Sequence, residues 1–151
     1  QLSRHFGYPF LDLDKGIETA EQKNISEIFE QKGEDFFRQK EKQILHQLNE
    51  DYPKFVMSCG GGTPCFFDNM EWMKKNGIVI WLHPPIEILA ERLIANKETR
   101  PLIKNAHSIQ EIISILSQQM NIRKPFYNQA HFKLEEPYPT IEGFKNLLKN
   151  A

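Results

Sequence analysis

Short apolar runs that alternate with amphipathic stretches are the feature that most restricts the fold of this chain. The run "IVIWL" (78–82) precedes "IEILAERLIA", in which apolar residues recur at helical spacing. The run "KFVMSC" (54–59) likewise precedes the helical stretch "DNMEWMKKNG". Continuously apolar strands are typical of a parallel sheet that is buried on both faces. We therefore predict an α/β fold, a three-layer sandwich with a central parallel sheet.

Two further strands are predicted at "PFLDLD" (9–14) and "HFKLE" (131–135). Between the first two strands, we predict two short helical pieces that meet near Asn24, then a strong helix over 33–50. A later helix is expected to end near Lys124, because the residue before a proline disfavours the α region. The polar stretch 96–108 lacks periodicity and predicts a mobile surface loop. Since no repeat or linker is visible, we predict one domain over 1–151.

The composition excludes several classes of partner. The 151 residues carry a formal net charge of −1 and 26% charged residues, which gives no reason to expect nucleic acid or an anionic membrane. The sequence has no apolar run near the length of a membrane span, and its two cysteines are too few for a disulfide framework. We expect a cytoplasmic protein, a monomer, in which any important positive charge is local.

Three consecutive glycines, Gly60–Gly62, follow the predicted strand at 54–59. Each glycine loses backbone entropy on folding, so a triplet is costly unless the chain needs positive φ or close contact with another group. One interpretation is a tight turn. The other is a loop that lets a ligand lie against bare main chain, since ligands of parallel α/β folds bind beyond the carboxyl ends of strands.

Two acids end the predicted strand at 9–14. Asp12 and Asp14 are two residues apart, so on a strand they would project from the same face and repel unless a cation or a hydroxyl group separates them. A carboxylate in this place could hold Mg²⁺ through water or deprotonate a hydroxyl. The alternative is an ordinary N-cap and turn pair where the strand meets a helix.

The arginines are few, five against fourteen lysines. The planar guanidinium suits carboxylate and phosphate, so a chain that uses lysine as its common cation raises a question at each arginine. Arg38 lies on the strong helix, with Glu41 one turn later and able to hold it. Arg100 lies in the polar loop, and Arg123 lies where a helix meets proline. A solvated surface charge is the alternative for each of them.

Five collinear motifs, "FLDLD", "GEDFFRQKE", "CGGG", "TRPLI" and "RKPFY", stand in the order and near the spacing of the shikimate kinase family, which the chain resembles along almost its whole length. The resemblance implies a P-loop kinase fold of the nucleoside-monophosphate-kinase type. It also implies transfer of the γ-phosphoryl group of ATP to the 3-hydroxyl of shikimate, a step toward chorismate and the aromatic amino acids. Shikimate and ATP would be its partners and Mg²⁺ its cofactor.

Carried over to this sequence, the resemblance implies a set of residues for shikimate. Asp14 would bind and deprotonate the accepting hydroxyl. Arg38 and Arg123 would bind the carboxylate, with Glu41 holding Arg38. Gly60, Gly61 and Gly62 would lie against the ring, and the helical region at about 15–50 would form the substrate-binding part.

A second set is implied for the nucleotide and metal. Asp12 and Ser58 would approach Mg²⁺ through water. Arg100 would act in catalysis from a mobile lid at about 96–108 by contacting the ATP phosphates. Arg92 and Pro137 would contact the adenine, although the family commonly has its lid arginine where Leu93 stands here.

One motif of the family, the phosphate-binding loop G-x-x-x-x-G-K-[ST], is absent from these 151 residues. The opening "QLSRHFG" is typical of the end of a helix, so we expect that loop and a first strand upstream of Gln1, and we expect the 151 residues alone to bind ATP weakly. Two alternatives stay open: a shikimate-binding protein without catalysis, and a related small-metabolite kinase such as gluconate kinase. The second agrees less well with two retained arginines, Arg38 and Arg123.

Overall fold

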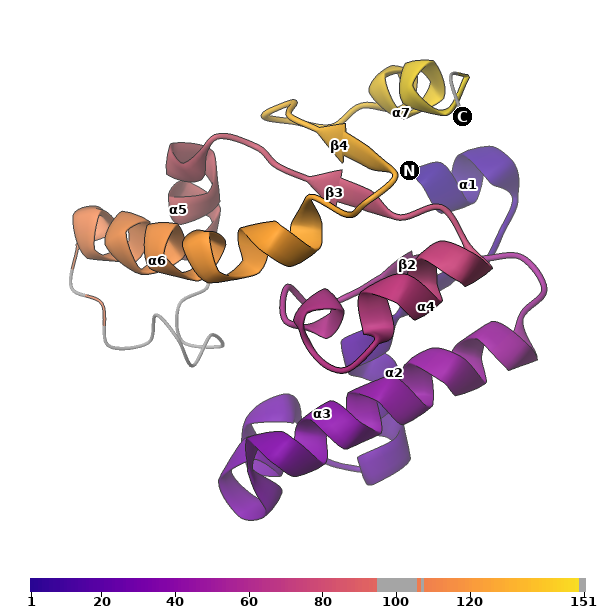
Figure 1. The fold of residues 1–151 in the computed structure, drawn as a ribbon, viewed down its shortest axis with the longest axis vertical. Helices are drawn as coiled ribbons and strands as arrows, with labels where there is room; N and C mark the ends of the chain where they lie inside the picture. Colours follow the sequence, from indigo (N-terminus) through magenta and orange to yellow (C-terminus); the bar gives the residue numbers. More distant parts are fainter. Residues whose placement is uncertain (95–105, 107, 150–151) are drawn as a thin grey trace. The chain divides into compact units, whose positions relative to one another are not determined.

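The computed structural model describes residues 1–94, 106 and 108–149. It divides into two compact units, Gln1–Gly77 and Ile78–Ala151. Each unit contains one pair of parallel strands together with helices, and Figure 1 shows the order of these elements along the chain. The alternation of strands and helices agrees with the predicted α/β fold.

The first unit begins with α1 (Leu2–Phe6), which ends at Gly7 in the left-handed conformation that glycine adopts without a Cβ penalty. Strand β1 (Phe10–Asp12) then pairs in parallel with β2 (Val56–Ser58). In this register Asp12 lies opposite Ser58, so the carboxyl ends of both strands present a polar residue.

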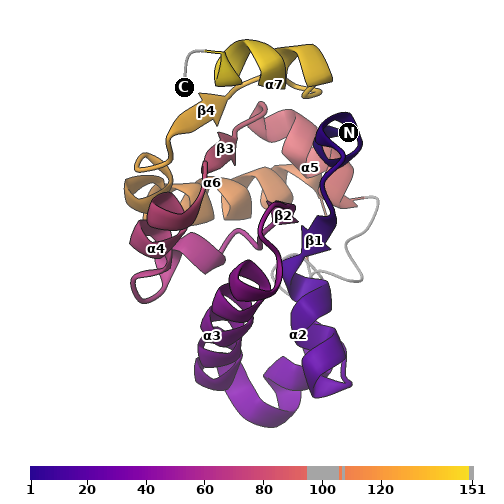
Figure 2. The ribbon, with the colours of Figure 1, turned by 90° about the vertical axis from the view of Figure 1, so that its right-hand side faces the viewer.

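Helices α2 (Leu13–Glu21) and α3 (Ile25–Asp51) lie side by side in the first unit, as both Figure 1 and Figure 2 show. The predicted break near Asn24 is confirmed, because Asn24 caps α3 in a reciprocal capping box with Glu27. A second break lies at Gly33, whose φ of 80° and ψ of 175° interrupt α3. The predicted strong helix is therefore the part of α3 that follows Gly33.

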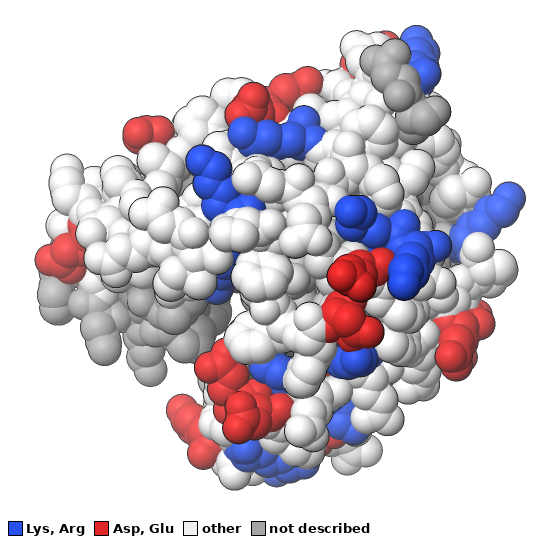
Figure 3. All heavy atoms as spheres, viewed as in Figure 1, with Lys and Arg blue, Asp and Glu red and all other residues white. Residues whose placement is uncertain are grey.

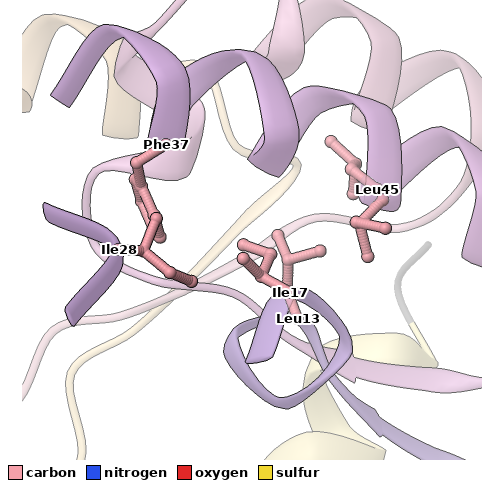
Figure 4. Packing of buried hydrophobic residues seen from close by; sticks show 6 residues of the cluster. Leu13, Ile17, Ile28, Phe37 and Leu45 are labelled. Atoms are coloured by element: carbon pink, nitrogen blue, oxygen red, sulfur yellow. The ribbon is translucent and has the colours of Figure 1, made fainter. Parts of the chain in front are cut away.

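Buried apolar side chains join α2 to α3. Leu13 and Ile17 of α2 are fully buried and face Ile28, Phe37 and Leu45 of α3 (Figure 4). This core fixes the part of α3 that follows Gly33 against the beginning of α2. It therefore determines where the polar residues next to these side chains lie.

After β2 the chain forms a short 3₁₀ turn, η1 (Thr63–Cys65), and then α4 (Asn69–Asn76). Helix α4 ends at Gly77, the last residue of the predicted helical stretch "DNMEWMKKNG". Thr63 and Asn69 at the starts of these two elements are both completely buried.

In the second unit, β3 (Ile80–Leu82) pairs in parallel with β4 (Phe132–Leu134). Helix α5 (Ile86–Ile94) packs on α6 (Ile109–Tyr127) through a core that includes Ala90 and Ile112.

The last helix of the second unit is α7 (Ile141–Leu148), which Thr140 caps through its side-chain hydroxyl. Each strand of the pair is thus followed by a helix, β3 by α5 and β4 by α7, which is the order predicted for a parallel sheet.

Two predicted boundaries were wrong. The strand predicted over 9–14 stops at Asp12, because Asp12 is the N-cap of α2 and Asp14 already lies in the first turn of that helix. Helix α6 does not end near Lys124 but continues through Pro125 to Tyr127. A proline removes one backbone donor, and this helix tolerates the loss in its last turn, where the chain closes with a bond from Asn128 N to the Lys124 carbonyl.

None of the described helices is both long enough and apolar enough to cross a bilayer. The predicted lid at about 96–108 lies mostly outside the described residues. The prediction of one domain over 1–151 stays a prediction.

Candidate functional site

The glycine triplet follows β2 and answers the question that its sequence raised. None of Gly60, Gly61 and Gly62 has a positive φ. A Cβ on Gly62 would instead lie 2.7 Å from both terminal nitrogens of Arg38, closer than real Cβ contacts come. A Cβ on Gly60 would lie 3.5 Å from Asp14 Oδ1. Gly62 therefore serves close approach between its backbone and the Arg38 guanidinium and not a left-handed turn, whereas a Cβ on Gly60 would make an ordinary contact.

Arg38 lies on α3 between two carboxylates of the same helix. Its Nη1 donates to Glu41 Oε2 at 2.9 Å, one turn later. Its Nε and Nη2 donate to Glu34 Oε1 at 3.2 and 3.1 Å. The prediction that Glu41 can hold Arg38 is confirmed, whereas Glu34 was not anticipated although its (i, i+4) spacing is visible in the sequence.

Aromatic rings and the glycine loop enclose the same guanidinium. Its central carbon lies 4.1 Å from the centroid of the Phe66 ring and 5.0 Å from that of Phe37. The Arg38 side chain is only 13% exposed. A cation held by two carboxylates, two rings and bare backbone has little freedom left to lose when an anion binds.

Glu41 is the buried member of the pair, with a side chain 1% exposed. The Thr63 hydroxyl donates to its Oε1 at 2.6 Å, while Arg38 occupies its Oε2. Burial raises the pKa of Glu41 above its ordinary value of 4.5, the bonds from Thr63 and Arg38 oppose that rise, and the nearby negative charge of Asp14 adds to it.

Thr63 is itself fixed by its backbone. Its N–H donates to the Gly60 carbonyl at 3.1 Å, and its own carbonyl accepts from Asn69 Nδ2 at 2.9 Å. Sequence reasoning missed both Thr63 and Asn69. The only available signal was their place directly after the glycines, because the contact of Thr63 with Glu41 spans 22 residues of sequence.

The two acids separate into different positions. Asp12 Oδ1 accepts from Lys15 N at 3.2 Å as the N-cap of α2, so the alternative interpretation of an N-cap is correct for this residue. Asp14, in the first turn of α2, is the acid that lies beside Gly60. The prediction that Asp12 and Asp14 project from the same face of one strand was therefore wrong.

The residues present fit a metal held mainly by water. Within the described part of the chain, no three His, Cys, Asp or Glu side chains form a metal-binding group. Asp12 and Ser58 nevertheless stand opposite each other at the carboxyl ends of β1 and β2. A single carboxylate beside a hydroxyl suits Mg²⁺, which keeps several waters and takes its remaining ligands from substrate phosphates.

Figure 3 shows basic and acidic side chains interspersed over the face in view. The enclosed guanidinium of Arg38 is distinguished from such surface charges by its burial, since its side chain is 13% exposed.

In the second unit, two residues predicted for the nucleotide lie together. Arg92 of α5 donates from Nη2 to the carbonyl of Pro137 at 2.5 Å. Its guanidinium also lies 4.9 Å from the centroid of the Tyr138 ring, which is 66% exposed. This cluster presents a planar cation and an exposed ring, two surfaces on which a flat aromatic base can stack.

Arg123 lies near the end of α6 and is half-buried. It has no hydrogen-bond or ion-pair partner within the part of the chain that the structure describes. Arg100 lies outside the described residues, so the prediction for its role stays a prediction.

Comparison with known proteins decides the family. The family model described as shikimate kinase matches residues 1–148. This chain belongs to the shikimate kinase family. A shikimate kinase from Parabacteroides distasonis is 36% identical over 151 residues, covering 100% of this chain and 86% of the relative. One from Azobacteroides pseudotrichonymphae is 42% identical over 129 residues, covering 85% and 75%.

Solved shikimate kinases have the same fold. The crystal structure of the enzyme from Bacteroides thetaiotaomicron matches with a TM-score of 0.84 and 32% identity, covering 98% of this chain and 84% of that one. The shikimate kinase from Acinetobacter baumannii, solved in complex with shikimate, matches with a TM-score of 0.81 and 30% identity over 99% and 79%. The predicted P-loop kinase fold and the shikimate kinase resemblance are both confirmed, and the chain is an ATP-dependent kinase of shikimate.

Proposed function

We propose that the glycine loop, Asp14 and Arg38 form the shikimate site, and that the enzyme transfers the γ-phosphoryl group of ATP to the 3-hydroxyl. A small hydroxylated carboxylic acid needs a cation for its carboxylate, an acceptor for its hydroxyls and bare backbone beside its ring. The first unit brings these three together, since Gly62 lies against Arg38 and Gly60 lies beside Asp14. That convergence is the observation that supports the proposal most strongly.

Arg38 binds the carboxylate of shikimate, with Arg123 as the second cation. Glu41 and Thr63 hold the guanidinium of Arg38 from behind. The partner of Arg38 that shikimate can replace is Glu34, because its side chain is 55% exposed and can turn into water. Arg123 has no competing partner among the described residues, so its guanidinium is available to the carboxylate of the substrate.

Asp14 accepts the hydrogen bond of the reacting hydroxyl and takes its proton as the phosphoryl group is transferred. Its neighbour Gly60 has no side chain to fill the space beside the carboxylate. Phosphoryl transfer depends mainly on positioning and on neutralising charge, so one oriented carboxylate is sufficient on the acceptor side.

Asp12 and Ser58 would hold Mg²⁺ through water at the ends of β1 and β2. When bound, this metal neutralises charge on the phosphates of ATP. Asp12 keeps one carboxylate oxygen on the backbone of α2, which fixes the orientation of the group toward the strand ends.

ATP binds through Arg92, Pro137 and Arg100. Arg92 and Pro137 are already in contact and contribute to the adenine site. Arg100 contacts the phosphates from the lid. The enzyme acts as a monomer in the cytoplasm.

A coupled assay of ATP consumption tests the function in the protein expressed from its complete gene. Addition of shikimate should start ADP release, whereas quinate and gluconate at the same concentration should not. The product should carry its phosphate on the 3-hydroxyl by ³¹P NMR. ATP turnover that does not depend on shikimate, or that gluconate supports equally, contradicts the proposal.

A further inference from the structure

We propose that the Thr63 hydroxyl is a positioning group for the substrate carboxylate, acting through Glu41 on Arg38. The inference rests on the proposed function of Arg38. It adds Thr63, a residue that touches no substrate itself, to the determinants of shikimate affinity.

The hydrogen-bond chain is continuous and buried. Thr63 Oγ1 donates to Glu41 Oε1 at 2.6 Å, and Glu41 Oε2 accepts from Arg38 Nη1 at 2.9 Å. Thr63 is completely buried and Glu41 is 1% exposed, so water does not easily replace either bond. The carboxylate of Glu41 is therefore fixed at both oxygens, which fixes the plane of the guanidinium that it holds.

Glu34 cannot do the same work. It reaches Arg38 through a single oxygen, and its side chain is 55% exposed. An exposed carboxylate contributes little and moves easily. Once a substrate carboxylate replaces Glu34, the orientation of Arg38 depends on Glu41, and that of Glu41 depends on Thr63.

The contact that keeps Thr63 in place comes with an unfavourable free-energy contribution at Asn69. Asn69 is completely buried and donates to the Thr63 carbonyl at 2.9 Å, yet its Oδ1 has no partner among the described residues. A buried polar atom without a partner is unfavourable. An apolar residue at 69 would remove that cost but would release the backbone of Thr63.

The test compares Thr63→Val, which removes the hydroxyl at nearly constant volume, with Thr63→Ser, which keeps it. Thr63→Val should raise the KM for shikimate about tenfold, as expected for a lost hydrogen bond to a charged group. The KM for ATP and kcat should change far less. Thr63→Ser should retain most of the wild-type affinity. Thr140→Val, the same change at the threonine that caps α7, is the matched control, because it removes a hydroxyl outside the proposed shikimate site and should leave the shikimate KM unchanged.

A double-mutant cycle with Glu41→Gln separates positioning from simple stability. If Thr63 acts through Glu41, then Thr63→Val should add little to the KM already raised by Glu41→Gln. Additive effects, or a Thr63→Val enzyme with lower melting temperature and unchanged shikimate KM, overturn the proposal. If Thr63→Val does not fold, Thr63→Ser gives the test. A Thr63→Ser enzyme with the melting temperature of the wild type but a tenfold higher shikimate KM would also overturn the proposal.

The pH dependence gives a third readout. The titratable groups that face Glu41 are the guanidinium of Arg38, the carboxylate of Asp14 and the thiol of Cys59, whose pKa burial raises to about 12 so that it stays neutral. Protonation of Glu41 weakens its bond to Arg38, so the shikimate KM should rise as the pH falls. Thr63→Val should move this rise to higher pH, because the lost bond favoured the ionised carboxylate. An unshifted profile contradicts the proposal, whereas a wild-type enzyme without shikimate-dependent turnover contradicts the proposed function itself.

Discussion

Arg38 in the first unit and Arg123 in the second are proposed to bind the same substrate carboxylate, yet the protein holds them differently. Arg38 is 13% exposed and bonded to two glutamates, with the Phe66 ring and Gly62 against its plane. Arg123 is half-buried and has no bonded partner among the described residues. In the proposed site, the first cation would be oriented before the substrate arrives, whereas the second would gain its orientation from the substrate.

The difference teaches how affinity is divided. An oriented arginine loses little conformational entropy on binding, but its existing partners compete with the ligand. An arginine without partners has no competitor, but it must be ordered when the ligand binds. An enzyme with one arginine of each kind holds the carboxylate in a fixed position and also offers it a second cation that has no competing partner.

The largest expected effect is on the turnover rate, through Asp14, and not on the binding of shikimate by the two arginines. Asp14→Asn should lower kcat about a thousandfold, because general bases contribute factors of about 10² to 10⁴. The amide keeps the size of the side chain, so the fold should survive, as circular dichroism would check. Unchanged turnover would remove Asp14 from the mechanism and leave the site as a binding pocket only.

The next test compares the two arginines directly. Arg38→Ala and Arg123→Ala should each raise the shikimate KM by roughly a hundredfold, since truncating a bonded charge pair costs about 2–5 kcal/mol. Only Arg38→Ala should also lower stability, by about 3 kcal/mol, because it leaves Glu41 buried without its cation. Shikimate titrations and thermal melts measure the two effects.

Two outcomes would break the comparison. Equal loss of stability in both variants would mean that Arg123 is also held by the protein. A rise in the ATP KM as large as the rise in the shikimate KM would argue against a carboxylate role for Arg123.

A smaller effect is expected at the glycine loop. Gly62→Ala places a Cβ where the terminal nitrogens of Arg38 lie, so the guanidinium must shift. We expect a shikimate KM about tenfold higher, since a displaced charge-assisted hydrogen bond costs about 1.5–3 kcal/mol. Gly77→Ala is the matched control, because its nearest atom would be 4.0 Å away. Similar KM values for the two variants would show that Arg38 does not depend on bare backbone.

The smallest effect concerns the nucleotide. Arg92→Ala should raise the KM for ATP by about threefold, the scale of a cation–π contact of roughly 0.5–1 kcal/mol. The shikimate KM should stay the same, in contrast to the changes at Arg38 and Gly62. Kinetics at saturating shikimate measure the first value and kinetics at saturating ATP the second. A selective effect on shikimate would remove Arg92 from the adenine site.

The sequence predicted the fold class and most elements because these depend on local patterns. The break at Asn24 follows from its capping chemistry, and Gly77 ends α4 as its position suggested. Boundaries failed where two local rules compete. The stretch 9–14 was predicted to be a strand throughout, but an aspartate is also a strong N-cap, and α2 begins directly after Asp12.

The site was predictable only in part. Arg38 and Glu41 are one turn apart, so their contact is visible in the sequence. The buried partners Thr63 and Asn69 depend on how α3 packs against the segment after β2, which no local pattern reports. The glycines were likewise predictable only in part. Their sequence implies an unusual backbone, but it does not show whether a positive φ or close contact with another group requires it.

The buried pair of Arg38 and Glu41 limits how this enzyme could be redesigned for another alcohol. If Arg38 binds the carboxylate as proposed, a variant for an uncharged acceptor would need Arg38 replaced. That replacement leaves the carboxylate of Glu41 buried without its cation. Exchanging both residues together for apolar ones of similar volume avoids that intermediate. Directed evolution by single substitutions should therefore yield few stable variants at Arg38 or Glu41. Libraries that vary both codons at once should yield stable double variants.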